Sequence, residues 1–402
     1  MKNLIKLLLE KPLFLRALLA LFVSGIGTAF TSVAVYQTLS TMNWGASGFG
    51  LAFAAGLLPG MLTSTISGKH SYKWPVGKML VAGQIIGLMA LLFPIFGTGE
   101  YQIWWLLLSE VLASAVSGLL IPIFKSLERS SFEEDQFPSL ASIDTFIITA
   151  NFILGQGVGA LLVSHLSLTL YLLFDVASYL IALILLWPLA RKLKSLSAEE
   201  EPGSDHRLPS FWALKPDQKK VLFLMNWLPL VTVPLMVTLP ARGLEFGASS
   251  KVVGFLTMTP ALFLICGRTA GQILGPMVAL KMNMERISQK SWSLSLALFL
   301  YIFGYTLAFL VPSLHLAVLC CMFAHLASNV VYSVGNFQLM KSFSASEIGW
   351  AAGFLYRSAS LIMGVVALLA GLVAAKWGWI SIIAFSLVAW LFGVLFWRKN
   401  VA

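Results

Sequence analysis

The hydrophobic pattern of the chain consists of long apolar runs that are separated by short polar breaks. Each run is about 20 residues long, which is the length that an α-helix needs to cross a bilayer. A membrane barrel would instead show alternating segments of about 10 residues, so the runs predict helices. The twelve predicted spans are Leu13–Tyr36, Ser47–Ser67, Val76–Phe96, Ile103–Phe124, Ser139–Val163, Leu168–Leu189, Val221–Leu239, Val252–Leu280, Trp292–Val311, His315–Phe337, Gly349–Ala375 and Trp379–Trp397.

The longest polar connection runs from Arg191 to Lys220 and follows the sixth predicted span. It contains an acidic run at 199–201 and the helix breakers Pro202 and Gly203. The pattern therefore predicts a six-helix half at 1–190, a cytoplasmic linker at 191–220 and a second six-helix half at 221–402. A short charged loop followed by a helix rich in small residues occurs in both halves, which indicates two related repeats.

Composition and charge support a membrane protein. The chain is 58% hydrophobic and only 11% charged, whereas a soluble domain is about a quarter charged. With the N-terminus in the cytoplasm, 21 of the 27 Lys and Arg residues fall on the cytoplasmic side, which predicts that both termini are cytoplasmic. The net charge of +10 then faces anionic lipid headgroups, so we expect the bilayer and not nucleic acid as the partner.

Several classes of chemistry lack a sequence signal. No GxxxxGK[ST] motif is present, which excludes ATP hydrolysis within this chain and leaves a secondary mechanism. The cysteines Cys266, Cys320 and Cys321 lie in apolar runs without metal-ligand spacing, and we expect buried thiols and no metal or other cofactor.

Short motifs in both halves carry a family resemblance. Phe14-Leu15-Arg16 opens the first span, the fifth contains the run at 151–159 (NFILGQGVG), and the sixth contains the run at 174–179 (FDVASY). Together with Gln338 and the Glu347-Ile348-Gly349 turn, they resemble the major facilitator superfamily, and within it the bacterial branch of macrolide and enterobactin-type siderophore exporters. The resemblance implies an all-α membrane protein of the bacterial inner membrane, with two pseudo-symmetric six-helix halves, that functions as a monomer.

Two positions depart from the family pattern. The loop between the second and third spans usually carries an Asp, and Gly68 occupies that place here, although Lys69 and Lys73 follow as expected for a gating loop. The fifth helix of antiporters usually has a Gly-Pro pair, and this chain has Gly155-Gln156. The resemblance therefore does not decide whether this loop relays charge or whether the fifth helix bends as in the family.

Acidic residues inside the spans are candidates for proton coupling, because ionisable groups are costly in a bilayer. The resemblance places the fourth helix, which holds Glu110, beside a central cavity, and Ser114 and Ser117 follow Glu110 on the same helical face. A carboxylate in a low dielectric binds its proton tightly, which suits a proton carrier; a buried, hydroxyl-bonded carboxylate is the alternative. Asp144 in the fifth span is the second candidate carrier. Asp175 in the sixth span is interpreted as a residue that ties helices together.

Polar side chains form a continuous stripe on the tenth span. His325, Asn329, Tyr332 and Asn336 recur at intervals of three or four residues on an otherwise apolar helix. They cannot face lipid, so we expect them to line the cargo route, with polar contacts between helices as the alternative. Ser24 and Thr28, followed by Thr31, give a smaller counterpart on the first span.

Two arginines lie in spans that contain no acid, Arg268 in the eighth and Arg357 in the eleventh. The resemblance places these helices, and the fifth helix with Asp144, at the seam between the halves. We expect Asp144 to form an ion pair with Arg268 or Arg357 that opens and closes during gating, or the arginines to bind an anionic cargo. Static ion pairs are the alternative.

The leading hypothesis is a proton-coupled exporter of a small organic molecule, most specifically a carboxylate-type siderophore. A multidrug or macrolide efflux pump is the close alternative. An uptake permease, a lipid flippase and a membrane-embedded enzyme that uses Glu110 and His325 as acid and base rank lower, and we expect no enzymatic activity.

Overall fold

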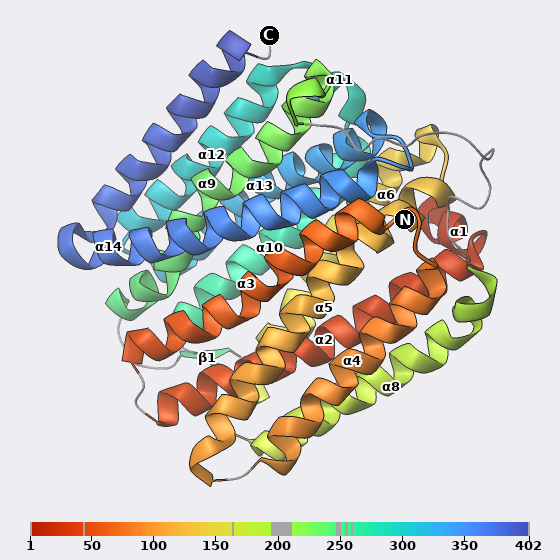
Figure 1. Ribbon diagram of the computed structural model, residues 1–402. Helices are drawn as coiled ribbons and strands as arrows, with labels where there is room; N and C mark the ends of the chain where they lie inside the picture. The colour runs from red at the N-terminus through yellow and green to blue at the C-terminus, as the bar shows by residue number, and fades with distance from the viewer. Residues whose placement is uncertain are drawn as a thin grey trace. The chain divides into compact units, whose positions relative to one another are not determined.

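The computed structural model describes residues 2–42, 45–97, 99–162, 165–193, 211–246, 251–253, 256–258 and 260–400, and these are almost entirely helical (Figure 1). Among them, 11 helical segments are long and apolar enough to cross a membrane. The predicted second span corresponds to a further long helix, α3 (Gly45–His70). The all-α membrane class is confirmed. Most of the predicted linker, residues 194–210, lies outside the described residues.

The elements follow one another in a simple order. They are α1 (Lys2–Leu9), α2 (Pro12–Thr41), α3, α4 (Val76–Phe96), η1 (Gly99–Tyr101), α5 (Gln102–Ser131), η2 (Glu134–Gln136), α6 (Phe137–Asn151), η3 (Phe152–Gly157), α7 (Val158–Leu162), α8 (Leu168–Lys192), η5 (Phe211–Ala213), α9 (Pro216–Glu245), β1 (Lys251–Val253), β2 (Leu256–Met258), α10 (Pro260–Lys281), α11 (Met284–Gln289), α12 (Ser291–Leu310), α13 (Leu314–Ser342) and α14 (Ile348–Asn400).

Proline and glycine mark several helix boundaries. Pro12, Pro216 and Pro260 open α2, α9 and α10, where the missing amide hydrogen would have no partner anyway. Within α14, Gly378 adopts φ 71° and ψ −177° and separates the last two predicted spans. Only glycine adopts this conformation without strain, and the kink there divides α14 into two helical segments. Figure 1 shows that the two segments of α14 run in different directions.

The predicted start of the eighth span is wrong. The apolar pattern predicts a helix from Val252 onward. Instead, β1 and β2 pair antiparallel, with Val252 opposite Thr257. β-Branched residues favour strands, and Pro260 then begins α10 at a position suited to proline. The eighth span is therefore shorter than the apolar pattern indicates.

The fifth predicted span is not a uniform α-helix. α6 passes into a π-helical turn at Phe152–Gly157, which contains the Gly155-Gln156 pair, before α7 resumes α-helical geometry. A π-turn inserts an extra residue and redirects the helix. The bend that the family usually obtains with proline is thus replaced by a different irregularity.

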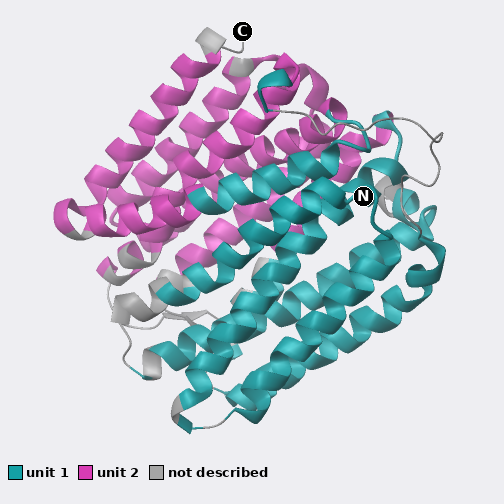
Figure 2. Cartoon of the chain, in the orientation of Figure 1, with its two compact units in different colours: residues 1–134, 150–213, 343–361 teal, residues 135–149, 214–342, 362–402 magenta. Residues whose placement is uncertain are grey.

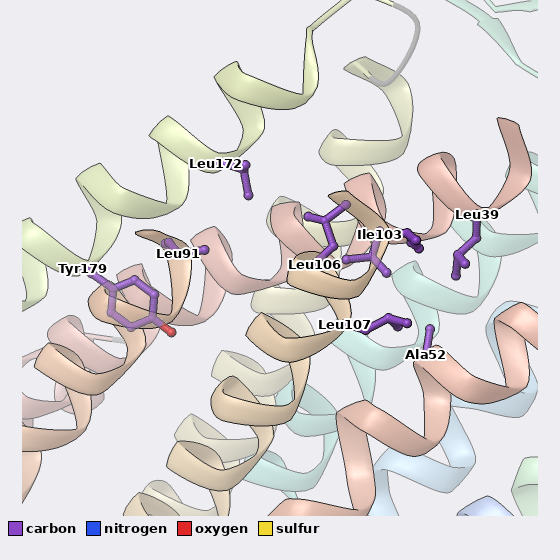
Figure 3. Close-up of a cluster of buried hydrophobic side chains, with 9 residues drawn as sticks. Leu39, Ala52, Leu91, Ile103, Leu106, Leu107, Leu172 and Tyr179 are labelled. Atoms are coloured by element: carbon purple, nitrogen blue, oxygen red, sulfur yellow. The ribbon is translucent and has the colours of Figure 1, made fainter. Parts of the chain in front are cut away.

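Unit 1 is the first of two compact units and comprises residues 1–134, 150–213 and 343–361 (Figure 2). In it α2 packs on α8, α4 on both α5 and α8, and α3 on α5. A buried apolar cluster holds these helices together; its members include Leu39, Leu91, Leu106, Leu172 and Tyr179 (Figure 3). The start of α14 belongs to this unit.

Unit 2 comprises residues 135–149, 214–342 and 362–402 (Figure 2). α10 packs along α13, and α12 packs against α13 and α9. The rest of α14 contacts the same unit through Trp390, whose indole donates to the carbonyl oxygen of Ser295 at 2.9 Å. The three-part division at 190 and 220 stays a prediction.

The three cysteines are free thiols in different surroundings. Cys321 is buried and Cys320 is half-buried, but Cys266 is exposed. The expectation of three buried thiols is wrong for Cys266, because an apolar run does not show which face of its helix packs against neighbours.

Candidate functional site

Glu110 on α5 lies where α5 meets α2 and α3. Its Oε1 atom accepts a hydrogen bond of 2.8 Å from Ser32 on α2, and a β-carbon on Gly56 of α3 would lie 3.5 Å from Oε2. Among the described residues, no Lys, Arg or His forms an ion pair with this carboxyl. Glu110 therefore relies on a hydroxyl, and not on a counter-charge, for stabilisation inside its span.

The other two polar residues of this α5 face have separate contacts. Ser114 is buried and accepts a hydrogen bond of 3.1 Å from the backbone amide of Gly60 on α3. Ser117 is exposed and donates to Ala113 of its own helix. On this face, Glu110 bonds to α2, Ser114 bonds to α3, and Ser117 remains exposed.

A fully buried carboxyl, Asp175 on α8, contacts the residue of α2 next to Ser32. Its Oδ2 atom accepts from Thr31 at 2.6 Å, and its Oδ1 atom accepts from Ser178 at 3.2 Å. Thr28 and the Tyr179 hydroxyl are 3.0 Å apart one turn away. Asp175 thus ties α8 to α2. Thr28 also lies in the contact between these two helices. Ser24 is buried, and its hydroxyl bonds among the described residues only to Leu21 of its own helix.

The four residues of the stripe on α13 differ in burial and in hydrogen-bond partners. His325 is 3% exposed, and its Nε2 atom is 2.7 Å from the Tyr305 hydroxyl of α12. Asn329 is half-buried and donates to the carbonyl oxygen of His325 at 2.9 Å. Tyr332 is half-buried, and Asn336 is buried, with an Nδ2 atom that meets no partner among the described residues. His325 therefore joins two helices.

The arginines of the spans differ in surroundings. Arg357 on α14 is exposed, and its guanidinium carbon lies 5.5 Å from the centre of the Phe354 ring. Arg268 on α10 is half-buried. Neither forms an ion pair with an acid of the described chain. Both guanidinium groups are therefore available to an anion.

Asp144 on α6 is buried in unit 2, the same unit that holds Arg268. The residue after it, Thr145, accepts a hydrogen bond of 3.1 Å from Ser333 of α13. Thr149, one turn later, donates to the carbonyl oxygen of Gln272 on α10 at 3.5 Å. The structure thus brings the helices of Asp144 and Arg268 into contact, whereas Arg357 belongs to unit 1.

The gating-loop lysines, Lys69 and Lys73, are exposed where α3 ends. The residue before them explains the missing family Asp. A β-carbon on Gly68 would lie 3.0 Å from the carbonyl oxygen of Gly349, at the start of α14. No larger side chain fits without moving one backbone away from the other.

Two further features were not found from the sequence. Glu128 is fully buried and pairs with Lys125 at 2.7 Å, although both lie beyond the end of the fourth predicted span at Phe124. A cavity of about 380 Å³ in unit 2 is lined by Trp227, Trp292, Ser295, Leu296, Phe299, Trp390, Val394 and Trp397. The spacing of the tryptophans along the sequence gives no signal, because they come from three helices.

Comparison with known families decides the identity of this fold. The family profile described as Major Facilitator Superfamily matches residues 17–239, which is more than half of the chain. The chain belongs to the major facilitator superfamily. No curated protein matches the sequence. The transporter class that the sequence predicted is thereby confirmed, and the exporter branch within it stays a prediction.

Solved structures of superfamily transporters share the fold at low sequence identity. The human organic anion transporter MFSD10 (TETRAN) has a TM-score of 0.70 at 12% identity, covering 96% of this chain and 99% of that one. A bacterial homologue of the iron transporter ferroportin, in an outward-facing state, has a TM-score of 0.68 at 16% identity and covers 96% and 98%. The E. coli fucose:proton symporter FucP has a TM-score of 0.65 at 13% identity, with 96% and 98% covered.

Proposed function

We propose that this superfamily member is a secondary active, proton-coupled exporter of a small organic anion, most specifically a carboxylate-type siderophore. The observation that carries the proposal is the set of unpaired charges within the spans. Glu110 has no described cationic partner, and Arg268 and Arg357 have no described acidic partner. Isolated charges in a membrane protein are retained where a transported ion or cargo neutralises them.

Glu110 is the leading proton carrier. Its hydroxyl partner Ser32 stabilises the ionised form, and the surrounding apolar helices stabilise the neutral form, so both states are accessible. Asp144 is the second candidate, on a helix that contacts α10 and α13. The proton coupling named for FucP is in line with this mechanism.

Arg357 and Arg268 are the proposed contacts for an anionic cargo. A guanidinium presents several donors in a fixed plane, which matches a carboxylate. The organic anion specificity named for MFSD10 fits the same chemistry. Polar contacts from Asn329, Tyr332 and Asn336 would orient the rest of the cargo.

The proposed direction, export from the bacterial cytoplasm, rests on the exporter-like motifs. The distribution of positive charge supports cytoplasmic termini. We propose a monomer in the inner membrane. The same geometry serves a multidrug pump if the cargo is neutral, so the choice of cargo is what the experiment must decide.

The deciding experiment uses purified protein in proteoliposomes under an imposed proton gradient. The matched pair of probes is a citrate-containing siderophore and a neutral macrolide. We expect the gradient to drive uphill movement of the siderophore, and Glu110→Gln or Asp144→Asn to abolish the proton dependence. Macrolide movement alone would favour the multidrug alternative, and full proton-driven transport by both variants would remove the proton assignment.

A further inference from the structure

Asp175 has an environment that a purely structural helix tie does not require. The residue is 1% exposed, and no basic side chain of the described chain pairs with it. Two hydroxyls, from Thr31 and Ser178, donate to its carboxyl. A neutral Asn or Thr would tie α8 to α2 without the cost of burying an ionisable group.

The two carboxyls, of buried Asp175 and half-buried Glu110, accept hydrogen bonds from neighbouring residues of one helix. Thr31 of α2 donates to Asp175 on α8, and the next residue, Ser32, donates to Glu110 on α5. Since the two donors are adjacent on α2, the charge of each carboxyl influences the other. Two ionised carboxylates that interact in a low dielectric repel each other, so the pair favours a state in which at least one of them is protonated.

The packing around Asp175 leaves little room for a larger cation. A β-carbon on Gly27 of α2 would lie 2.0 Å from the Ser178 hydroxyl and 2.4 Å from Oδ1 of Asp175. One turn along α8, a β-carbon on Gly87 of α4 would lie 2.4 Å from the Tyr179 ring. A proton neutralises Asp175 without forcing these closely packed helices apart.

The titratable groups that face the pair come from three helices. They are Glu110 on α5, Tyr36 on α2 and Tyr179 on α8 itself. α4 contributes backbone against Tyr179 and no charged side chain at this contact. Of this set, the carboxyls release a proton far more readily than the tyrosine hydroxyls, so a transferable proton is held by a carboxyl.

We propose that Asp175 is a second proton-carrying residue and that it shares one transferable proton with Glu110 across α2. The inference rests on the proposed proton coupling and extends it to α8. During transfer, an O–H bond breaks at one carboxyl and forms at the other, and the pair keeps a constant total charge. Ser32 and Thr31 hold the two acceptor oxygens in place on adjacent positions of α2.

The test follows the pair directly, without cargo or gradient. Purified protein in lipid nanodiscs is titrated through the neutral range while infrared difference spectroscopy records the carbonyl stretch of neutral carboxylic acids. We expect one such band in the wild type and its loss in the double variant of Glu110→Gln and Asp175→Asn. Each single variant should shift the midpoint of the remaining band by about one pH unit, because the remaining carboxyl loses the electrostatic influence of its partner.

Two additional variants secure the interpretation. Thr31→Val keeps the shape of the side chain and removes one donor, so it should also shift the midpoint by about one pH unit. Asp217→Asn, which removes an exposed carboxyl at the start of α9, should leave the band unchanged. If Asp175→Asn and Thr31→Val both leave amplitude and midpoint unaltered, Asp175 is only a helix tie. Failure of proton-driven transport with an intact shared band would instead overturn the proposed function alone.

Discussion

Gly68 on α3 and Gly349 on α14 approach each other so closely that a β-carbon on the first would lie 3.0 Å from the carbonyl oxygen of the second. The contact continues one turn along α14, where a β-carbon on Gly353 would lie 2.4 Å from the carbonyl oxygen of Ser64. Ser71 and Ser126 hydrogen-bond beside it at 3.2 Å. Small residues thus allow α3, α5 and the start of α14 to pack backbone against backbone.

The first prediction concerns this glycine contact. Gly353→Ala should lower the free energy of unfolding by roughly 1–3 kcal/mol, because the added methyl meets backbone that cannot rotate away. Gly371→Ala on the same helix is the matched control, since nothing lies within 4 Å of its added carbon. Thermal unfolding followed by tryptophan fluorescence measures both, and equal melting temperatures would show that the α3–α14 contact is loose.

The second prediction concerns the end of the α13 stripe nearest Tyr305. Tyr305→Phe should destabilise the protein by about 1–3 kcal/mol, because buried His325 loses its hydroxyl partner. Thr306→Val is the control, since Thr306 is half-buried and, in the described part of the chain, bonds only to Ile302 of its own helix. The comparison uses the same thermal melts. A Tyr305→Phe variant as stable as the wild type would reopen the assignment of His325 to the cargo route.

The third prediction separates cargo-facing from packed positions on α13. In a background without Cys266, Cys320 and Cys321, the half-buried positions Asn329→Cys and Tyr332→Cys should react with a water-soluble thiol reagent. Ala327→Cys and Val334→Cys, which replace residues that are 6% and 0% exposed, should react at least about tenfold more slowly. Equal rates at all four positions would contradict a cargo route along this face.

The fourth prediction tests charge selectivity. Arg357→Gln should weaken binding of a carboxylate-bearing ligand by about tenfold or more, the effect of losing one charge-assisted hydrogen bond, and should leave a neutral ligand unaffected. Arg16→Gln, an exposed arginine at the start of α2, is the control. Isothermal titration with the matched ligands measures the difference. An equal loss for both ligands would identify Arg357 as a structural residue.

The sequence by itself determined the class of this protein and the course of most helices. A helix that crosses a bilayer needs about 20 apolar residues and makes its backbone hydrogen bonds within itself. The apolar runs from α2 to α14 therefore show the spanning helices directly in the sequence. The local exceptions were the β1–β2 hairpin and the π-turn at Phe152–Gly157. Hydropathy along the sequence cannot detect them, because the side chains are equally hydrophobic in a strand, a π-turn or an α-helix.

The tertiary structure alone decided which polar residues meet. Helical periodicity correctly grouped His325 with Asn329 on one face, but it could not show that Tyr305 covers His325. Thr31 and Asp175 are 144 positions apart and come into contact only because α2 packs on α8. A periodic pattern specifies the direction of a side chain around its own helix, whereas its partner is fixed by the arrangement of the helices in space.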